Sequence, residues 1–217
     1  MNEKHPGVFE DGGRFYTVNL APGNKVYGED IVKENGEEYR EWNPNRSKLS
    51  AALKKGLSEL PIKKGSKVLY LGAAQGTTPS HVSDIIRKDG VVYCVEFSER
   101  AMRDLLDVCE TRSNMVPVLA DARKPNEYGW VEMVDVLYQD VAQPDQIKIL
   151  KRNARSFLKS GGWVMIAVKA RAIDVTKEPG EIYKDIKPEL EEEFEISEFI
   201  ELDPFEGDHC FIVARKA

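Results

Sequence analysis

The chain has 217 residues, 41% of them hydrophobic and 31% charged, which suits one domain of ordinary core size with a small appendage. Its formal net charge of −6 argues against a protein that grips nucleic acid unaided, because neutralisation of phosphates by basic side chains supplies most of that affinity. No apolar run reaches transmembrane length and the N-terminus lacks a signal-peptide stretch, so we expect a cytoplasmic protein without a targeting signal or a membrane partner. Cys94, Cys109 and Cys210 form neither a CxxC motif nor a metal-ligand spacing, so we expect small buried side chains and no metal.

Residues 1–42 are expected to form a small, mostly antiparallel β module. Residues 15–20 alternate in β fashion, and 25–27 resume a strand after a turn. Asn35-Gly36 is typical of the two-residue turn of a hairpin. The remainder, 43–217, is expected to be a separate α/β domain.

A helix is predicted to begin at Asn43-Pro44, where a capping residue precedes a proline. Lys48 lies in its early turns, away from the buried stripe, which consists of Leu49, Leu53, Leu57 and Leu60.

The segment from Val68 to His81 reads as a strand, a glycine turn and the start of a helix. Gly72 and Gly76 allow the backbone to approach a ligand, and we expect Gly72 and Ala73 to contact a cofactor. Thr78 followed by Pro79 indicates an N-cap, and Gly90 is expected to close this helix in a left-handed conformation.

Further strands that alternate with helices are predicted at 91–95, 116–119, 134–138 and 163–168. Two more strands, at 194–202 and 209–214, have no helix between them. Ser98 is predicted to cap one helix, whose inward face carries Met102, Leu105, Leu106 and Cys109. A later helix is predicted to stop at Gly161-Gly162 and to turn inward Ile147, Leu150, Ala154, Phe157 and Leu158. A last helix, roughly 180–193, is predicted to kink or break at Pro188. The two last strands must pair antiparallel. Glu96, about twenty residues past the glycine turn, is placed to bind a ribose diol.

This order of elements is typical of class I S-adenosylmethionine-dependent methyltransferases: a Rossmann-like α/β fold with a seven-stranded, mostly parallel sheet and a terminal antiparallel hairpin. The turn Gly72-xxx-Gly76 is not the GxGxxG of dinucleotide enzymes. The missing glycine argues against a cofactor with a pyrophosphate, and therefore against a nicotinamide-dependent enzyme.

Four polar residues are predicted to meet at the carboxyl edge of this sheet: Lys48, Asp140, Lys169 and His209. A lysine at the end of the apolar run WVMIAVK is hard to explain by packing. One interpretation is a structural ion pair between Lys169 and Asp140. The other is activation of an alcohol for methyl transfer, in which a lysine takes the proton and Asp140 positions the lysine or the hydroxyl.

The sequence closely resembles fibrillarin in its archaeal form, along essentially its whole length. The resemblance is carried by YREWNPNRSKLSAAL, VLYLGAAQGTTPSHVSDI, VYCVEFSERAMRDLL, ADARKP, DVLYQDVAQPDQ and DHCFIVARK. It implies an enzyme that methylates the ribose 2′-oxygen of rRNA, and of tRNA in archaea, with S-adenosyl-L-methionine. Within it the catalytic set falls on Lys48, Asp140, Lys169 and His209. The implied cofactor-binding residues are Thr77, Thr78, Glu96, Phe97, Asp121, Ala122, Asp140, Val141, Ala142 and Gln143.

The resemblance also implies partners: a box C/D guide RNA that pairs with the substrate, a Nop-domain scaffold protein, and a kink-turn-binding ribosomal-protein homologue. An acidic enzyme suits this arrangement, since the guide and the scaffold would select and hold the RNA. Lys151, Arg152, Arg155 and Lys159 form either a local basic stripe or an ordinary solvated face, and we favour the latter. Two alternatives stay open, a methyltransferase that acts alone on a small molecule or a protein, and a non-enzymatic assembly subunit.

Overall fold

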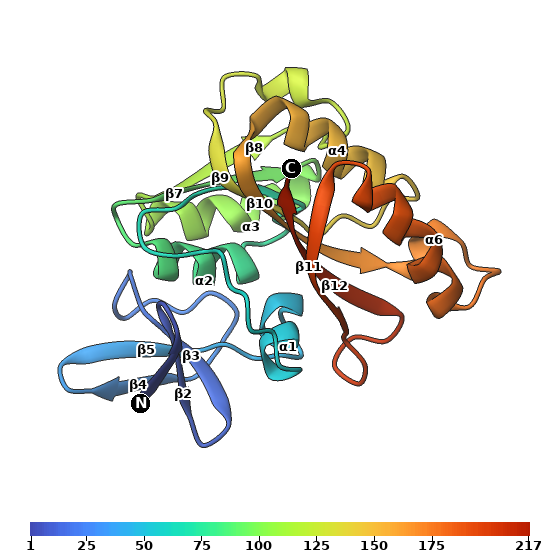
Figure 1. The fold of residues 1–217 in the computed structure, drawn as a ribbon. Coiled ribbons are helices and arrows are strands. Elements are labelled where there is room, and N and C mark those ends of the chain that lie inside the picture. The colour runs from blue at the N-terminus through green and yellow to red at the C-terminus, as the bar shows by residue number, and fades with distance from the viewer.

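The computed structural model describes residues 1–217 and contains two β-sheets (Figure 1). A five-stranded sheet near the N-terminus lies beside a larger seven-stranded sheet that is covered by helices (Figure 1). None of the helices is long and apolar enough to cross a bilayer.

The N-terminal module is an antiparallel sheet in the order β1-β2-β3-β5-β4. Its strands are β1 (Asn2–His5), β2 (Val8–Asp11), β3 (Arg14–Val18), β4 (Ile31–Glu34) and β5 (Glu37–Glu41). The predicted hairpin turn is confirmed, and both Asn35 and Gly36 have positive φ.

The strand predicted at 25–27 is absent. The carboxylate of Glu29 accepts hydrogen bonds from the backbone N–H groups of Val26 and Tyr27. These donors are therefore used inside a loop and are not available to a strand partner. The sequence did not predict β1 and β2, which lie at the edge of the sheet opposite β4.

The larger sheet has the order β11-β12-β10-β9-β6-β7-β8 and confirms the predicted fold class. β6 to β10 are parallel to one another, and β12 inserts antiparallel beside β10. The strands are β6 (Lys67–Leu71), β7 (Val91–Glu96), β8 (Met115–Leu119), β9 (Val134–Gln139), β10 (Leu158–Lys169), β11 (Phe194–Glu201) and β12 (His209–Lys216).

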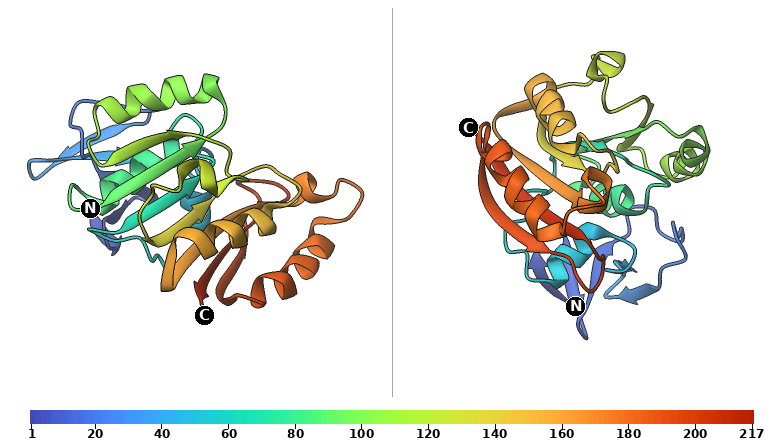
Figure 2. Two further views of the ribbon diagram at one scale, coloured as in Figure 1. Left: turned by 90° about the horizontal axis from the view of Figure 1, so that it is seen from above. Right: turned by 90° about the vertical axis from the view of Figure 1, so that its right-hand side faces the viewer.

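Helices cover both faces of this sheet, as the view from above in Figure 2 shows. They are α1 (Lys48–Lys54), α2 (Thr77–Ile86), α3 (Glu99–Glu110), α4 (Gln146–Phe157), α5 (Ala170–Ile173) and α6 (Pro179–Glu191), with a 3₁₀ turn η1 (Pro125–Tyr128). Alternation along β6 sends Val68 and Tyr70 to the core beneath α1, α2 and α3, and Leu69 and Leu71 to the core beneath α4 and α6.

Two predicted helix starts are wrong, and both corrections concern the site. α1 begins at Lys48, because the Ser47 side chain accepts from the backbone N–H of Ser50; Leu57 and Leu60 are buried but lie beyond its end. α2 begins at Thr77 after Gly76, whose φ is 87°, so Thr78 is inside the helix and does not cap it.

Some predicted helix ends are also wrong. α2 ends at Ile86, and Arg87 takes the positive φ that was expected of Gly90. Gly90 is instead required by close packing, since a Cβ there would lie 2.5 Å from the carbonyl oxygen of Ser66. Leu158 begins β10 and is not the last helical residue of α4.

Other differences are smaller. Ser98 caps α3 as predicted, but Leu106 is exposed while Met102 and Leu105 are buried. α6 continues through Pro188 to Glu191 without a break. Cys94 and Cys210 are buried as expected, whereas Cys109 is half-buried.

A fully buried ionic network joins the N-terminal module to the larger sheet. Arg40 of β5 donates to Glu29 at 2.6 Å and to Asp84 of α2 at 2.9 Å, and Arg112 donates to the other oxygen of Asp84 at 2.6 Å. Beside it the buried His81 ring stacks on Trp42 with centroids 4.9 Å apart. The module is therefore anchored on α2, the helix that follows the glycine turn.

Candidate functional site

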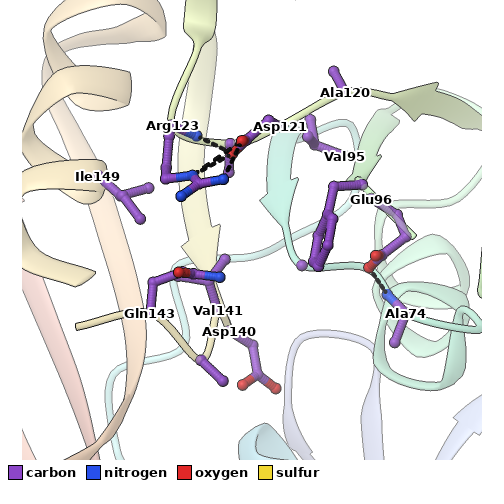
Figure 3. Close-up of a pocket in the computed structure, with 14 residues that line it drawn as sticks. Ala74, Val95, Glu96, Ala120, Asp121, Arg123, Asp140, Val141, Gln143 and Ile149 are labelled. Carbon is purple, nitrogen blue, oxygen red and sulfur yellow. Dashed lines mark hydrogen bonds and ion pairs between the residues drawn. The ribbon is translucent and has the colours of Figure 1, made fainter. Parts of the chain in front are cut away.

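A cavity of about 230 Å³ lies at the carboxyl ends of the central parallel strands (Figure 3). This is the edge at which open α/β sheets bind ligands. The lining residues come from the ends of β6, β7, β8 and β9 and from α4: Gly72, Ala74, Val95, Glu96, Phe97, Ala120, Asp121, Ala122, Arg123, Asp140, Val141, Ala142, Gln143 and Ile149.

Glu96, the last residue of β7, is fixed by the backbone around it. One carboxylate oxygen accepts from the N–H of Ala74 at 2.9 Å (Figure 3). The other accepts from the N–H of Ser98 at 2.8 Å. The side chain is therefore held between the glycine turn and the start of α3, with lone pairs left for a ligand hydroxyl. Phe97 beside it is 68% exposed, so its ring face is available to a flat ligand.

Asp121, which follows β8, is paired with Arg123 across the cavity wall. The guanidinium donates from Nε at 3.0 and 2.9 Å and from Nη2 at 2.7 Å (Figure 3). These bonds from Arg123 hold the pKa of the Asp121 carboxyl below its usual value. Asp121 therefore presents an ionised, acceptor-only group to the cavity.

Gly72 is needed where β6 meets β9. Its φ is 83°, and a Cβ would lie 2.3 Å from the carbonyl oxygen of Asp140. The sequence reading assigned this glycine to the approach of a ligand. The structure shows a second reason for a glycine here. The N–H of Asp140 donates to the carbonyl of Leu71 at 2.9 Å, and only a residue without a Cβ lets the backbone of Asp140 come this close.

Asp140 forms an ion pair with Lys48 at the edge of the cavity. Lys48 Nζ donates to Asp140 Oδ2 at 3.0 Å, and the two side chains are 20% and 24% exposed. The sequence suggested a structural ion pair between Asp140 and Lys169. In the structure the partner of Asp140 is Lys48. No side chain donates to Asp140 Oδ1, so that oxygen is free for a substrate group.

Lys48 is placed by its neighbour Ser47. The Ser47 hydroxyl caps α1, and it also accepts from the Thr78 hydroxyl at 2.9 Å in the first turn of α2. Both Ser47 and Thr78 are buried. Thr78 therefore fixes the start of α1, and through it Lys48, relative to the glycine turn.

Lys169 and His209 are brought together by the sheet. They are the last pair in the antiparallel register of β10 and β12. Lys169 is exposed, and His209 is buried with its Nδ1 2.7 Å from the carbonyl oxygen of Gly207. The predicted juxtaposition at one sheet edge follows from β12 running beside β10.

Three of the predicted cofactor residues do not line the cavity. Ala73 is buried in the core, Thr78 binds Ser47, and Thr77 lines a neighbouring groove with Gln75. The cavity residues that sequence reasoning missed are Ala74, Val95, Ala120, Arg123 and Ile149. Of these only Arg123 carried a signal, namely its position two residues after Asp121.

Comparison with known proteins decides the family. A model of the family described as Fibrillarin matches residues 1–217. The chain is 56% identical over 211 residues to the fibrillarin-like rRNA/tRNA 2′-O-methyltransferase of Methanopyrus kandleri, covering 96% of this chain and 91% of that one. The chain belongs to the fibrillarin family.

Solved fibrillarin structures show the same architecture. The Methanococcus jannaschii fibrillarin pre-rRNA processing protein superimposes with a TM-score of 0.95 at 51% identity, over 99% of this chain and 96% of that one. Aeropyrum pernix fibrillarin, in complex with natively bound S-adenosyl-L-methionine, gives 0.86 at 57% identity, over 93% and 88%. Fibrillarin in a fibrillarin/Nop5p complex gives 0.91 at 43% identity, over 98% of each chain.

Proposed function

We propose that this fibrillarin transfers a methyl group from S-adenosyl-L-methionine to a ribose 2′-oxygen of rRNA or tRNA, at a position chosen by a box C/D guide RNA. The observation that carries the proposal is the Lys48–Asp140 ion pair at the edge of the cavity, with one carboxylate oxygen left free. A free carboxylate oxygen beside a cofactor cavity is suited to hold an incoming hydroxyl.

The cavity suits a cationic cofactor. Its charged lining residues are Glu96, Asp121, Asp140 and Arg123. Arg123 pairs with Asp121 and Lys48 pairs with Asp140, so the Glu96 carboxylate is left without a cationic partner and the charge around the cavity is negative. A pyrophosphate would be repelled by this lining, whereas a sulfonium would be stabilised. Glu96 would accept from a ribose diol and Asp121 from an exocyclic amine of the base. The bound cofactor would supply an electrophilic methyl group.

The residues at the edge would prepare the hydroxyl for transfer. Asp140 Oδ1 would accept the hydrogen bond of the 2′-hydroxyl and so fix the direction of its oxygen lone pair. Lys48 holds Asp140 in place at that position. Lys169 and His209, paired across β10 and β12, are the groups proposed to take the proton that the oxygen loses.

The charge of the surface supports delegation of RNA binding. Three members of the basic stripe on and after α4 are neutralised by acidic neighbours: Lys151 by Glu192, Arg155 by Glu193 and Lys159 by Asp135, each at 2.6 Å. We infer that RNA is presented by the guide, with a Nop-domain scaffold protein and a kink-turn-binding ribosomal-protein homologue. The name of the fibrillarin/Nop5p complex supports such a scaffold.

The test is methyl transfer from labelled S-adenosyl-L-methionine to a guide-paired RNA, with and without the two partner proteins. Label on one ribose 2′-oxygen, present only with guide and partners, is the expected result. Label with the protein alone would show that it selects its own substrate. Absence of label in every mixture, with the cofactor bound, would favour a non-enzymatic assembly subunit.

A further inference from the structure

Two buried glutamines form a chain of hydrogen bonds behind the site. The side chain of Gln146, the first residue of α4, makes two bonds to the backbone of Lys169. Its Nε2 donates to the Lys169 carbonyl at 3.0 Å, and its Oε1 accepts from the Lys169 N–H at 3.1 Å. Gln139, the last residue of β9, donates from Nε2 to the backbone carbonyl of Gln146 at 2.8 Å. Both glutamine side chains are fully buried.

The Gln146 amide pairs with the backbone of β10 at a point beyond the end of the neighbouring strand β9. β9 and β10 are parallel neighbours, and their last register pair joins Gln139 to Ile166. β10 continues for three more residues to Lys169, where no backbone of β9 remains to pair with it. A primary amide offers one donor and one acceptor, as a peptide group does. Gln146 thus completes the ladder at the backbone of Lys169.

This arrangement connects the two sides of the site. Gln139 immediately precedes Asp140, and the bond from Gln139 to Gln146 ties the end of β9 to the start of α4. Gln146 then ties α4 to Lys169. The chain Asp140–Gln139–Gln146–Lys169 therefore sets the separation of the backbones that carry the carboxylate and the lysine. Neither glutamine lines the cofactor cavity.

We propose that Gln146 is a positioning residue for methyl transfer, which holds Lys169 at a fixed place relative to Asp140 while leaving cofactor binding unaffected. The inference rests on the proposed function, since it assigns a purpose to the position of Lys169 in that reaction.

The first test is Gln146→Met, which has a similar length and makes neither bond. We expect the single-turnover rate of guided methyl transfer to fall about a hundredfold, the cost of misplacing a reacting group by about 1 Å. The dissociation constant for S-adenosylhomocysteine, measured by calorimetry, should stay within about threefold of the wild type, because Gln146 does not line the cavity. A rate within threefold of the wild type would overturn the proposal, and so would an equal loss of cofactor affinity.

Gln146→Glu gives a second test that does not depend on the folding of the methionine variant. A neutral carboxyl reproduces both bonds: its carbonyl accepts from the Lys169 N–H, and its O–H donates to the Lys169 carbonyl. An ionised carboxylate loses the second bond and repels that carbonyl. Burial raises the pKa of such a carboxyl, so the change should occur between about pH 6 and pH 9.

The measured quantity is the rate of Gln146→Glu divided by that of the wild type at each pH. Titration of Asp140, Asp145, Lys169, Asp208 or His209 acts on both proteins and is divided out to a first approximation. The ratio should be within threefold of one at low pH and fall at least tenfold as pH rises. A ratio that does not change with pH, whether high or low, overturns the proposal.

Asn114→Asp is the matched control. Asn114 is also a buried amide that binds backbone, since it donates to the carbonyls of Ser83 and Arg87 at the far end of α2. Its variant should show no pH-dependent loss of rate relative to the wild type. A wild type that transfers no methyl group would refute the proposed function itself, whereas an active wild type with an unchanging ratio refutes only the role of Gln146.

Discussion

Asp84→Asn should remove much of the stability of this protein, although it replaces only one oxygen by an NH₂ group. Asp84 is fully buried on α2. Its two oxygens accept from Arg40 at 2.9 Å, from Arg112 at 2.6 Å, from the Thr17 hydroxyl at 2.8 Å and from the Leu20 N–H at 2.9 Å. An asparagine in the same place can accept at only one of the two positions, and its NH₂ would face donors at the other.

The magnitude follows from the charges. The network holds the cations Arg40 and Arg112 and the anions Asp84 and Glu29, so it is neutral. Burial lowers the pKa of Arg112, and the charge of Asp84 opposes this effect. Without that charge the network carries one uncompensated buried cation. Breaking a buried pair in this way costs about 3–5 kcal/mol. That is a large part of the total free energy of unfolding of an ordinary domain, about 5–15 kcal/mol.

The assay is urea unfolding, followed by far-UV circular dichroism and by the fluorescence of tryptophan, since Trp42 stacks on His81 beside the network. Asp185→Asn is the matched control: Asp185 pairs with Lys177 at 2.7 Å, but the two side chains are 61% and 48% exposed. Its loss should cost less than about 1 kcal/mol.

Because the network crosses from the N-terminal module to α2, we also expect both probes to report one transition in the wild type. An Asp84→Asn cost equal to that of the control would refute the reasoning about buried charge. Two separate transitions in the wild type would instead show that residues 1–42 and 43–217 unfold independently.

Four further changes test the site and its support. Asp140→Asn should lower guided methyl transfer about a hundredfold or more, since the carboxylate that is proposed to hold the hydroxyl is lost; a rate near that of the wild type would contradict the proposed role. Ser47→Ala should cost about 1 kcal/mol of unfolding free energy through the lost cap, and it should slow transfer by releasing Lys48 while cofactor affinity, measured by calorimetry, stays the same. Glu96→Gln should weaken S-adenosylmethionine binding about tenfold, because a charged acceptor becomes a neutral one; an unchanged dissociation constant would exclude Glu96 from the cofactor site. Burial and two nearby guanidiniums lower the pKa of His81 well below 6.5, so below about pH 6.5 the unfolded chain takes up a proton that the folded chain does not. The free energy of unfolding should therefore fall there by up to about 1.4 kcal/mol per pH unit. His81→Gln should show a smaller fall in acid unfolding experiments.

Much of the larger sheet could be predicted from the sequence because its strands are apolar runs of strand length separated by helical periodicity. The last two strands lack a helix between them, and this alone required an antiparallel pair. If the last strand inserts beside the fifth, the same reasoning brings His209 to the rim that carries Asp140 and Lys169, and β12 does lie beside β10 with His209 paired to Lys169. Prediction from the sequence failed at helix ends, where a single residue decides: the Ser47 side chain moves the start of α1 to Lys48, and the positive φ of Arg87 ends α2 before Gly90.

The site, too, could be predicted only in part. Its carboxylates Glu96, Asp121 and Asp140 were predictable, since each follows a parallel strand and such strand ends meet at one edge. The partners of those carboxylates were not. Lys48 lies 92 residues before Asp140, and nothing in the spacing distinguishes it from Lys169 as the residue that forms the ion pair.

The sequence by itself determined the succession along the chain of the strands of the larger sheet, the edge at which polar residues gather, and the family to which the chain belongs, because these depend on local periodicity and on contiguous motifs. The tertiary structure alone decided which charges pair. Asp84 collects two arginines from other elements, and Gln146 completes a ladder that β9 has left. Such contacts join residues far apart in the chain, and their geometry is set by the packing of whole elements, which no local pattern encodes.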